Sequence, residues 1–550
     1  AAYTLQPSGY VALAGDATLA NGRVAQLQVD GNSVNAMWFG GVWNGVADDS
    51  AVIQSASTRG NVLLPPLTLI TSVVMTEGAS LFGDAKGSVV YCNNGAGVIN
   101  VSFLSDSGVD LSHYVKNVVF IAKAVGGTCI ETEKGAGISL TNRPRFTFKS
   151  LLFRGINLGA SGSVWQYTEG WEKCISVGDC FSTKIDKINV YGTYNIEADQ
   201  ASSPDDTGIY LDGLQSVRGV RITNYQTSDV KFPLDIGDNV TSIWLDGFDM
   251  SRSHSGVVSS HVGNSSEVQI LNGYVNAQYV GIHLNKRSWA FVNNVNVTRH
   301  PNGFDHSSEW IGLNLGLNFN DGCVSNMRIL DAGTWANVGT RTAVLLSDVL
   351  RSKFSSITCD SANGNLDFGF NLINSSADLV FNNMIFDDVD VLWNFGAGSS
   401  DISVGIYEFR GAPVSRFSFD ASIATNSIYN NFDLHGFGST EETYDAALET
   451  QVRLIRSTGQ RWDVKVSTND AFTVRDTTAT ENRIEIPAGL ALIKFGGQIR
   501  PTTDNAVDNG SSAFFWRDTY SEDFISKSPN GTMYRLRAPD GGGTATWTAV

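Results

Sequence analysis

A six-residue pattern of apolar and polar positions recurs along the middle of the chain. Each copy has an apolar residue, two small or polar residues, an apolar residue, any residue, and a final apolar residue. Ten copies occur, at Val115–Phe120, Phe153–Leu158, Ile185–Val190, Ile222–Thr227, Leu245–Met250, Ile270–Val275, Val292–Val297, Val324–Ile329, Phe354–Cys359 and Phe381–Phe386. The spacing of their first positions varies from copy to copy, which indicates a short structural unit that accepts insertions of varying length.

The third position of the pattern predicts a tight bend between two short strands. It is occupied by Asn117, Gly155, Lys187, Asn224, Gly247, Asn272, Asn294, Asn326, Ser356 and Asn383. Asn and Gly tolerate the left-handed backbone conformation that such a bend requires. A third strand is expected about ten residues upstream. It is represented by Ile209–Leu211, Leu234–Ile236, Ile282–Leu284, Leu313–Leu315, Val344–Leu346 and Phe370–Leu372.

Three short strands per repeat predict an all-β fold, a parallel β-helix, in which each coil buries its apolar face only by stacking on its neighbours. A β-sandwich would show hairpin turns about every 8–12 residues, and a propeller would keep a period of about 40–45 residues. An α/β solenoid would need a helical period in every repeat. None of these patterns is present in the sequence.

The segment before the repeats predicts a turn and one short helix within residues 44–56. Asp48 and Asp49 suit the start of that helix, because carboxylates cap free N–H groups and favour the positive end of the helix dipole. The apolar residues Ala51, Val52 and Ile53 are expected to cover the open end of the first coil.

The repeat spacing fails after about Phe409, which indicates further domains. Residues 441–456 are compatible with a helix or a transition segment. Short alternating strands are predicted at 462–466, 472–474, 484–486 and 534–536. We therefore expect a neck and capping helix over residues 1–60, the β-helix over 61–410, a transition segment over 411–455 and a small β-rich domain over 456–550.

Composition excludes several functional classes. Of 550 residues, 38 are Lys or Arg and 55 are Asp or Glu, so the net charge of −17 argues against nucleic acid as a partner. No apolar stretch approaches the length of a membrane-spanning helix, and no signal peptide is visible, so membrane insertion is not expected. The six cysteines lack metal-ligand spacing, so we predict free thiols, no metal and no cofactor. The start at Ala1, without Met, suggests a processed or truncated piece.

Two terminal segments resemble a known family. Residues 44–54 resemble the Asp-Gly-x-x-Asp-Asp-(Ser/Thr)-x-x-Ile-Gln capping helix of pectate-lyase-like β-helices in bacteriophage tailspikes, with Asn44 in place of the first Asp. The segment from Pro501 to Asn505, followed by Trp516 to Tyr520, is similar to C-terminal repeats of phage tail fibres and tailspikes. Residues 528–536 also fit that group.

The resemblance implies a right-handed β-helix and a homotrimeric tailspike of the phage virion. Such a protein attaches to the host cell and depolymerises a bacterial surface polysaccharide, either capsule or O-antigen. The missing N-terminal region would then join it to the virion, and the C-terminal domain would serve trimerisation or receptor binding. The resemblance supplies no catalytic residues, so the site must be argued from this chain.

Glycosidic hydrolysis requires two carboxyl groups, about 5–5.5 Å apart for retention of configuration or about 6.5–9.5 Å apart for inversion. Neighbouring coils of a β-helix lie about 4.8 Å apart, so aspartates at equal positions on adjacent coils lie near the first distance. Aspartates one coil further apart lie near the second, so both outcomes stay open. Asp212 and Asp235 are separated by the same increment as Ile222 and Leu245, the first positions of two successive copies. The sequence therefore predicts that these two aspartates stack on the outer surface as a catalytic pair.

Asp249 is a further catalytic candidate within a predicted column of outward polar residues. The equivalent pattern position in other copies holds Asn157, Asn189, Gln226, Tyr274, Asn296 and Arg328. Such a column suits hydrogen bonding to sugar hydroxyl groups. Asp246 adjoins the bend and is expected to serve the turn.

The insertion from His300 to Trp310 is the third candidate, because loops on a rigid scaffold often carry function. Its candidate catalytic residues are Asp305 and Glu309, and His306 and Trp310 are candidates for substrate binding. Trp165 and Trp335, from other insertions, are added to the substrate-binding set. Other insertion residues, including Glu169, Trp171 and Asp206, are expected to be structural.

Two other functions remain open at this stage. A polysaccharide lyase would need a cation against a uronate carboxylate, which Arg299 or Arg328 provides, and a base such as His283, His300 or Tyr274. A receptor-binding adhesin would need no stacked carboxylates.

Overall fold

The computed structural model describes most of the chain up to residue 430 and, beyond it, nine strands and Thr532. The gaps before residue 430 are 1, 9, 14, 29–32, 77, 85–86, 94–98, 104–111, 135–144, 162–163, 197–205, 214–215, 260–264, 286, 302–308, 317–318, 334–338, 363–365, 406, 412 and 420–427. The chain divides into two compact units, Ala1–Ala447 and Leu448–Val550.

The first unit begins with a small antiparallel sheet and a capping helix. The sheet has the order β1-β3-β2, formed by β1 (Ala2–Leu5), β2 (Ala17–Thr18) and β3 (Val24–Gln28). A 3-10 helix, η1 (Ala36–Phe39), and the helix α1 (Ser50–Ser57) follow. In the described part of the chain, neither helix has the length and apolar character needed to span a membrane.

The helix α1 occupies the predicted place but starts differently from the prediction. Asp48 accepts a hydrogen bond from Ser50 N–H at 3.0 Å, as expected of a capping carboxylate. Asp49 makes no side-chain cap, because its buried carboxylate accepts from Val42 N–H at 2.9 Å instead. Ile53 is buried and packs on the first coils, whereas Ala51 is exposed.

The remainder of the first unit is one parallel sheet of 29 strands that coils upon itself. The first part comprises β4 (Ser33–Asn35), β5 (Asn61–Leu63), β6 (Leu67–Ile70), β7 (Val73–Val74), β8 (Leu81–Phe82), β9 (Ser88–Cys92), β10 (Ile99–Phe103), β11 (Ser112–Ala122), β12 (Thr128–Lys134), β13 (Arg145–Gly155), β16 (Lys173–Val177), β17 (Lys184–Tyr191), β18 (Thr207–Leu211), β19 (Val217–Ser228) and β20 (Phe232–Ile236). The second part comprises β21 (Val240–Ser259), β22 (Ser265–Asn285), β23 (Arg287–Arg299), β24 (Trp310–Gly316), β25 (Cys323–Asp331), β26 (Arg341–Ser347), β27 (Lys353–Ser361), β28 (Leu366–Ile373), β29 (Ala377–Asp387), β30 (Val389–Phe395), β31 (Ser400–Val404), β32 (Tyr407–Arg410), β33 (Ser415–Phe419) and β34 (Ile428–Asn430).

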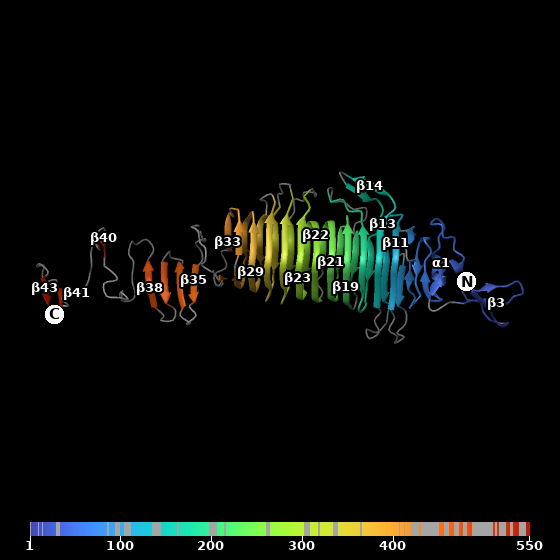
Figure 1. The fold of residues 1–550 in the computed structure, drawn as a ribbon, viewed down its shortest axis with the longest axis horizontal. Helices are drawn as coiled ribbons and strands as arrows, with labels where there is room; N and C mark the ends of the chain where they lie inside the picture. Colours follow the sequence, from blue (N-terminus) through green and yellow to red (C-terminus); the bar gives the residue numbers. More distant parts are fainter. Residues whose placement is uncertain are drawn as a thin grey trace. The chain divides into compact units, whose positions relative to one another are not determined.

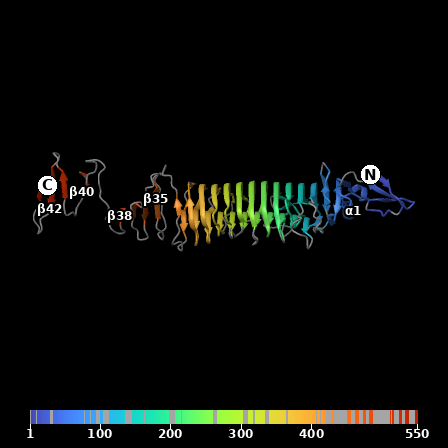
Figure 2. The same ribbon diagram turned by 90° about the horizontal axis from the view of Figure 1, so that it is seen from below.

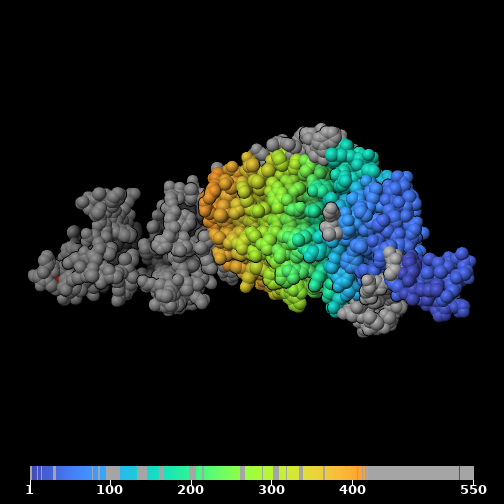
Figure 3. Space-filling view, turned by 45° about the vertical axis from the view of Figure 1, so that its right-hand side comes forward, coloured from blue at the N-terminus to red at the C-terminus, as the bar shows by residue number. Residues whose placement is uncertain are grey.

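This unit is a right-handed parallel β-helix. The sequence pattern predicts the parallel β-helix, and the family resemblance implies its right hand. Its strands lie side by side in sequence order in both ribbon views (Figures 1 and 2). One ladder runs through β17, β19, β21, β22, β23, β25, β27 and β29. Another runs through β16, β18 and β20, then through the C-terminal parts of β21 and β22, and on through β24, β26, β28 and β30. A hairpin of β14 (Leu158–Ser161) and β15 (Val164–Tyr167) stands off this stack (Figure 1). Successive coils form successive bands of colour in the space-filling view (Figure 3).

The bend predicted at the third pattern position is confirmed. Nine of the ten predicted residues have a positive φ, as in Asn224 (53°), Gly247 (68°) and Asn294 (56°). The Asn side chains also link neighbouring coils, because Asn294 Nδ2 donates to Asn272 Oδ1 at 2.8 Å and Asn272 Nδ2 donates to Asp246 Oδ1 at 2.8 Å. The role expected for Asp246 at the turn is thus confirmed.

One copy of the pattern was misplaced. In β13 the bend is Ser150, with φ 55°, and the apolar positions are Phe148, Leu151 and Phe153. The segment Phe153–Leu158 also satisfies the pattern, but it lies at the end of β13 and leads into the hairpin. Asn157 is therefore outside the polar column.

A second column of left-handed residues, which the sequence analysis missed, lies five residues before the first. It comprises Ser182, Gly219, Ser242, Glu267, Trp289, Asp321, Arg351 and Asp378. These residue types share no preference for the left-handed conformation, so no composition signal marks the column. Each of these coils therefore has two bends with a constant separation.

The core lies inside the coils and contains the pattern's apolar positions, such as Leu245, Phe248 and Met250. All six cysteines are free thiols; Cys323 is partly buried and the other five are buried, as predicted.

The second unit is described almost entirely through its strands, and all four predicted strands are confirmed. An antiparallel sheet is formed by β35 (Thr450–Ile455), β36 (Arg461–Val466), β37 (Phe472–Asp476) and β38 (Glu481–Ile486). Smaller antiparallel sheets are formed by β39 (Gly510–Ser511) and β40 (Phe514–Phe515), and by β41 (Phe524–Lys527), β42 (Met533–Arg537) and β43 (Thr546–Ala549). Residues 450–455 are a strand, so the helix considered for 441–456 is wrong in this part.

Candidate active site

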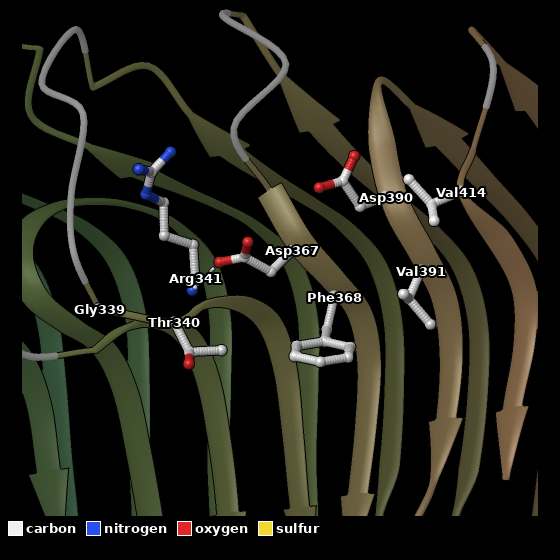
Figure 4. Close-up of a pocket in the computed structure, with 8 residues that line it drawn as sticks. All are labelled: Gly339, Thr340, Arg341, Asp367, Phe368, Asp390, Val391 and Val414. Atoms are coloured by element: carbon white, nitrogen blue, oxygen red, sulfur yellow. Dashed lines mark hydrogen bonds between the residues drawn. The ribbon is translucent and has the colours of Figure 1, made fainter.

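A cleft of about 380 Å³ opens where β26, β28 and β30 begin (Figure 4). It is lined by Gly339, Thr340, Arg341, Asp367, Phe368, Asp390, Val391 and Val414. Arg341, Asp367 and Asp390 come from the starts of three successive strands of one ladder. Phe368 and Val391 supply an apolar part of the lining, so the cleft combines a few charged groups with an apolar wall.

Asp367 and Asp390 stack on adjacent coils. Leu366 pairs with Val389, and Phe368 pairs with Val391, so the two aspartates between them are in register. Neighbouring strands are about 4.8 Å apart, which sets the backbone separation of the pair. In the close-up both carboxyl groups rise on the same side of the cleft (Figure 4). This is the stacked arrangement that the sequence predicts for Asp212 and Asp235.

The two carboxyl groups have different surroundings. Partial burial and the negative charge of Asp367 raise the pKa of Asp390, and the positive charge of Arg341 acts in the opposite direction. Asp367 is oriented by the Arg341 backbone N–H, which donates to Asp367 Oδ2 at 2.7 Å. Two carboxyl groups with different surroundings therefore lie side by side: Asp390 is partly buried and has a raised pKa, and Asp367 is oriented by a hydrogen bond.

The wall behind Arg341 is a buried ion network. Arg341 Nη1 lies 3.9 Å from Asp331 Oδ2, and Arg299 Nη1 lies 3.5 Å from Asp331 Oδ1. Gly333 N–H also donates to Asp331 Oδ1 at 2.9 Å. All three charged side chains are buried, so the charge of Arg341 is balanced from inside the protein.

The predicted stacking of Asp212 and Asp235 is wrong. Asp235 pairs with Tyr210, and Leu211 pairs with Ile236, so Asp212 lies two positions further along the strand. The cause is that Ile209 pairs with Leu234, which makes the coil two residues longer in this ladder than the step from Ile222 to Leu245. The two aspartates are diagonal neighbours, about 7–8 Å apart at the backbone.

Asp212 and Asp235 still belong to one polar group around Tyr210. The hydroxyl of Tyr210 donates to Asp212 Oδ2 at 3.1 Å, and Lys173 Nζ lies 4.0 Å from the centre of the Tyr210 ring. Burial first, and then the charges of Asp212, Asp235 and Asp238, raise the pKa of Tyr210. In this group Asp212 is a hydrogen-bond acceptor for Tyr210.

The predicted column of outward polar residues is confirmed from Asn189 onward. The pairings run in order through Asn189, Gln226, Asp249, Tyr274, Asn296 and Arg328. Asp249 is exposed and accepts from Ser251 Oγ at 2.6 Å. Arg328 is held by an ion pair, in which its Nη2 lies 2.5 Å from Asp360 Oδ2. The column presents hydrogen-bonding groups on successive coils.

The candidates in the insertion are only partly described. Glu309 is exposed just before β24. Trp310 is 1% exposed and belongs to the core, so its predicted contact with sugar is wrong. Asp305, His306 and Trp335 lie outside the described residues, as does the side chain of Trp165, whose backbone forms part of β15.

The insertion residues expected to be structural are confirmed in that role. Glu169 accepts from the backbone N–H and the side-chain amide of Asn157, which ties the base of the β14–β15 hairpin. Trp171 is buried in the core. Asp206 is buried, and its carboxylate accepts from the N–H and the hydroxyl of Thr193 at 3.0 and 3.2 Å.

Sequence reasoning missed Asp367 and Asp390, although a signal for them exists. Each lies three residues before an aromatic core residue of the same ladder, Phe370 or Trp393, and these two aromatic residues pair with each other. A search for aspartates whose separation equals the coil length of their own ladder would have found them. Arg341 carries no such signal, because its role depends on a buried contact with Asp331.

The chain is similar in fold to solved structures of phage tailspikes, at low sequence identity. No family model and no curated protein matches the sequence. Among solved structures, the full-length tailspike protein 2 of an Escherichia coli O157:H7 bacteriophage is 12% identical, with a TM-score of 0.34 over 86% of this chain and 57% of that one. A tailspike of an Acinetobacter phage is 11% identical, with a TM-score of 0.36 over 93% and 90% of the two chains.

A third similar structure is DFA-IIIase from Arthrobacter chlorophenolicus A6 in complex with GF2. It is 13% identical, with a TM-score of 0.39 over 72% of this chain and 94% of that one. This chain spans little more than half the length of tailspike protein 2. None of the three supplies a site residue, so the candidate site rests on this chain's own geometry.

Proposed function

We propose that the protein is an endo-acting glycoside hydrolase that depolymerises a bacterial surface polysaccharide, either capsule or O-antigen, in the cleft at β26, β28 and β30. The observation that carries this proposal is the stacked pair of Asp367 and Asp390. Their carboxyl groups face one cleft from adjacent coils and differ in surroundings, as an acid and a nucleophile or base must.

The roles follow from the surroundings of each carboxyl group. Asp390, whose pKa is raised, donates its proton to the glycosidic oxygen as the bond to the leaving sugar breaks. Asp367, oriented by the Arg341 N–H, attacks the anomeric carbon and forms a covalent glycosyl-enzyme. Water then hydrolyses that bond while Asp390 takes up the proton. The spacing of about 4.8 Å between adjacent coils favours this retaining course over inversion.

Hydrolysis is better supported than lyase chemistry. A lyase needs a cation that faces the uronate carboxylate, whereas Arg299 is buried against Asp331 and Arg328 is paired with Asp360. In the cleft, a uronate would meet Asp367 and Asp390, and Arg341 is already balanced by Asp331. The substrate expected in this cleft is therefore a polysaccharide segment of uncharged sugars.

The proposed setting is a homotrimeric tailspike of a phage virion, which acts outside the bacterial cell. It is supported by the sequence resemblance at both ends of the chain and by the parallel β-helix. Sedimentation equilibrium tests the assembly: a mass three times that of the chain is expected, and a stable monomer would contradict this part of the proposal.

Product analysis tests the reaction. The full chain is incubated with purified capsular and O-antigen polysaccharides, and the products are examined by mass spectrometry. Oligosaccharides that weigh whole repeating units plus one water are expected. Fragments that lack this water and carry an unsaturated end would establish a lyase. Binding of a polysaccharide without any fragments would establish an adhesin.

A further inference from the structure

Three exposed aromatic side chains gather on neighbouring coils, away from the strands that form the cleft. Trp244 pairs with Gln269, and Gln269 pairs with Phe291, so the three form one outward column across β21, β22 and β23. Trp289 lies two residues before Phe291 on β23. The exposed fractions of Trp244, Phe291 and Trp289 are 38%, 42% and 58%. We call Trp244, Trp289 and Phe291 the aromatic strip.

The backbone holds Trp289 in an unusual exposed position. Its φ is 55°, in the left-handed region, where a bulky side chain is uncommon and costs energy. Its N–H donates to Asn320 O at 3.0 Å, which fixes it to the next coil. An aromatic side chain that is strained and mostly exposed adds little to the core, so its place points to a ligand.

Polar groups are interleaved with the aromatic strip. The Arg221 guanidinium lies 5.1 Å from the centre of the Trp244 ring. Gln269 Nε2 donates to Glu267 Oε1 at 3.2 Å, and Ser242 Oγ donates to Glu267 Oε2 at 3.3 Å. Opposite charges thus flank the rings on coils that also carry hydrogen-bonding amide and hydroxyl groups.

This mixture fits sugar rings better than a second protein surface. A pyranose has an apolar C–H face that packs on an aromatic ring and hydroxyl edges that need hydrogen bonds. The core of a protein interface is depleted in charged residues, whereas Arg221 and Glu267 lie beside the rings here. Because charges of both signs are present, the surface favours an uncharged chain. Two coil spacings, about 10 Å, separate Trp244 from Phe291, which suits an extended ligand along the coils.

We propose that the aromatic strip is a second carbohydrate-binding site, which holds an uncharged polysaccharide chain by stacking sugar rings on Trp244, Trp289 and Phe291. The ligand class rests on the proposed function, but the site itself is independent of the cleft. It would keep the enzyme on the polysaccharide between cleavage events.

Affinity electrophoresis tests the proposal with the full chain. Native gels contain dextran or one of a set of purified uncharged O-antigen and capsular polysaccharides. The parent protein carries Asp390→Asn, so that the gel matrix is not digested. The test variant adds Trp244→Ala, Trp289→Ala and Phe291→Ala. The matched control adds Tyr191→Ala, which removes another exposed aromatic side chain (45%) from a different place on β17.

The parent is expected to be retarded in at least one gel. The triple variant should lose retention by a factor of at least about ten, and the Tyr191→Ala control should match the parent. Because three substitutions can lower the yield of folded protein, Trp289→Gly alone is a second test. Gly suits the left-handed backbone, so this variant should fold and bind about threefold more weakly.

Three results would overturn the proposal: no retardation of the parent in any gel, equal retardation of the triple variant, or a smaller sedimenting mass of the triple variant. The last would make the aromatic strip a contact between copies of the chain. The cleft is tested separately, because strip substitutions without Asp390→Asn should leave the cleavage of short oligosaccharides unchanged. Loss of cleavage by Asp390→Asn with retention intact would support both sites.

Discussion

Two pairs of aspartates have the same separation in the sequence but different positions relative to each other in this β-helix. Asp367 and Asp390 are in register and share a cleft, whereas Asp212 and Asp235 are displaced by two positions. The difference lies in the turns. The separation of Asp212 and Asp235 equals the step from Ile222 to Leu245, but the ladder that carries these aspartates takes a longer step, from Ile209 to Leu234. Two residues stack only when their separation equals the number of residues between paired positions in the ladder that carries them.

The largest expected effect is on the rate of polysaccharide cleavage, which should depend on one pair of aspartates and hardly on the other. Asp390→Asn or Asp367→Asn should lower the rate of cleavage by roughly 10²–10⁴-fold, because each removes a group that acts on the glycosidic bond. Asp212→Asn and Asp235→Asn should leave the rate within about threefold. The release of reducing ends, measured on the same polysaccharide, checks this prediction. An equal loss in Asp235→Asn would show that register is the wrong criterion for the site.

The next effect concerns the buried ion network behind Asp367 and Asp390. Asp331→Asn should lower the free energy of unfolding by about 3–5 kcal/mol, because it leaves Arg299 and Arg341 buried without their carboxylate. Asp321→Asn is the matched control, since Asp321 pairs with Arg351 at the surface and such pairs contribute about 0–1 kcal/mol. Denaturant unfolding compares the two variants. Equal losses would contradict the ion network as a support of the cleft.

Asp206, a buried carboxyl group just before β18, differs from Asp331 in its partners. Asp206 accepts hydrogen bonds from Thr193, whereas Asp331 lies between two arginines. Burial raises the pKa of Asp206 to about 7, despite the hydrogen bonds from Thr193. The folded state therefore holds this proton more tightly than the unfolded state, whose carboxyl has a pKa of about 4. The resulting stabilisation is complete below about pH 4 and is lost as the pH rises to about 7.

The variant Asp206→Asn isolates this effect. The free energy of unfolding of the natural chain, minus that of the variant, should fall steadily between pH 4.5 and pH 7.5. Thermal unfolding at several pH values measures this difference, in which the titration of other groups cancels. A constant difference would mean that Asp206 remains ionised in the folded protein.

The smallest effect concerns the bends that set the register of both pairs. Asn272→Ala should lower the free energy of unfolding by about 1–2 kcal/mol, because Ala resists the left-handed conformation and loses the bond to Asp246. Asn272→Gly keeps the backbone freedom and should cost less. Denaturant unfolding distinguishes the two variants. Equal losses in the two variants would contradict the backbone contribution and assign the stability of the bend to the side-chain bond alone.

The fold was predictable because its signal is local and repeated. Asn and Gly at one bend, with apolar residues at fixed offsets, revealed the coils and placed all but one copy correctly. The failure at Phe153–Leu158 arose because the pattern also matched a segment that leads into the β14–β15 hairpin. The second bend could not be predicted from the residue types, since residues as different as Trp289 and Gly219 occupy it.

The site was less predictable because it depends on lengths and burial that no local pattern encodes. The polar column from Gln226 to Arg328 followed directly from the repeat and is confirmed. Trp310 has the same residue type as a sugar-stacking side chain, yet it points into the core. Asp390 acquires its raised pKa from burial and from Asp367 on the next coil, a contact that requires the register of β28 and β30 to be known.

The two bends of each coil remain five residues apart in eight consecutive coils, while the coils themselves differ in length. The segment between the two bends therefore has the same length in each of these coils, and every insertion or deletion must be accommodated elsewhere on the coil. The turns that vary are the ones that lead to the cleft. Substrate specificity could thus be re-engineered by exchanging those turns between β-helices. The five-residue segment between the bends would stay unchanged and would keep the strands of neighbouring coils in register.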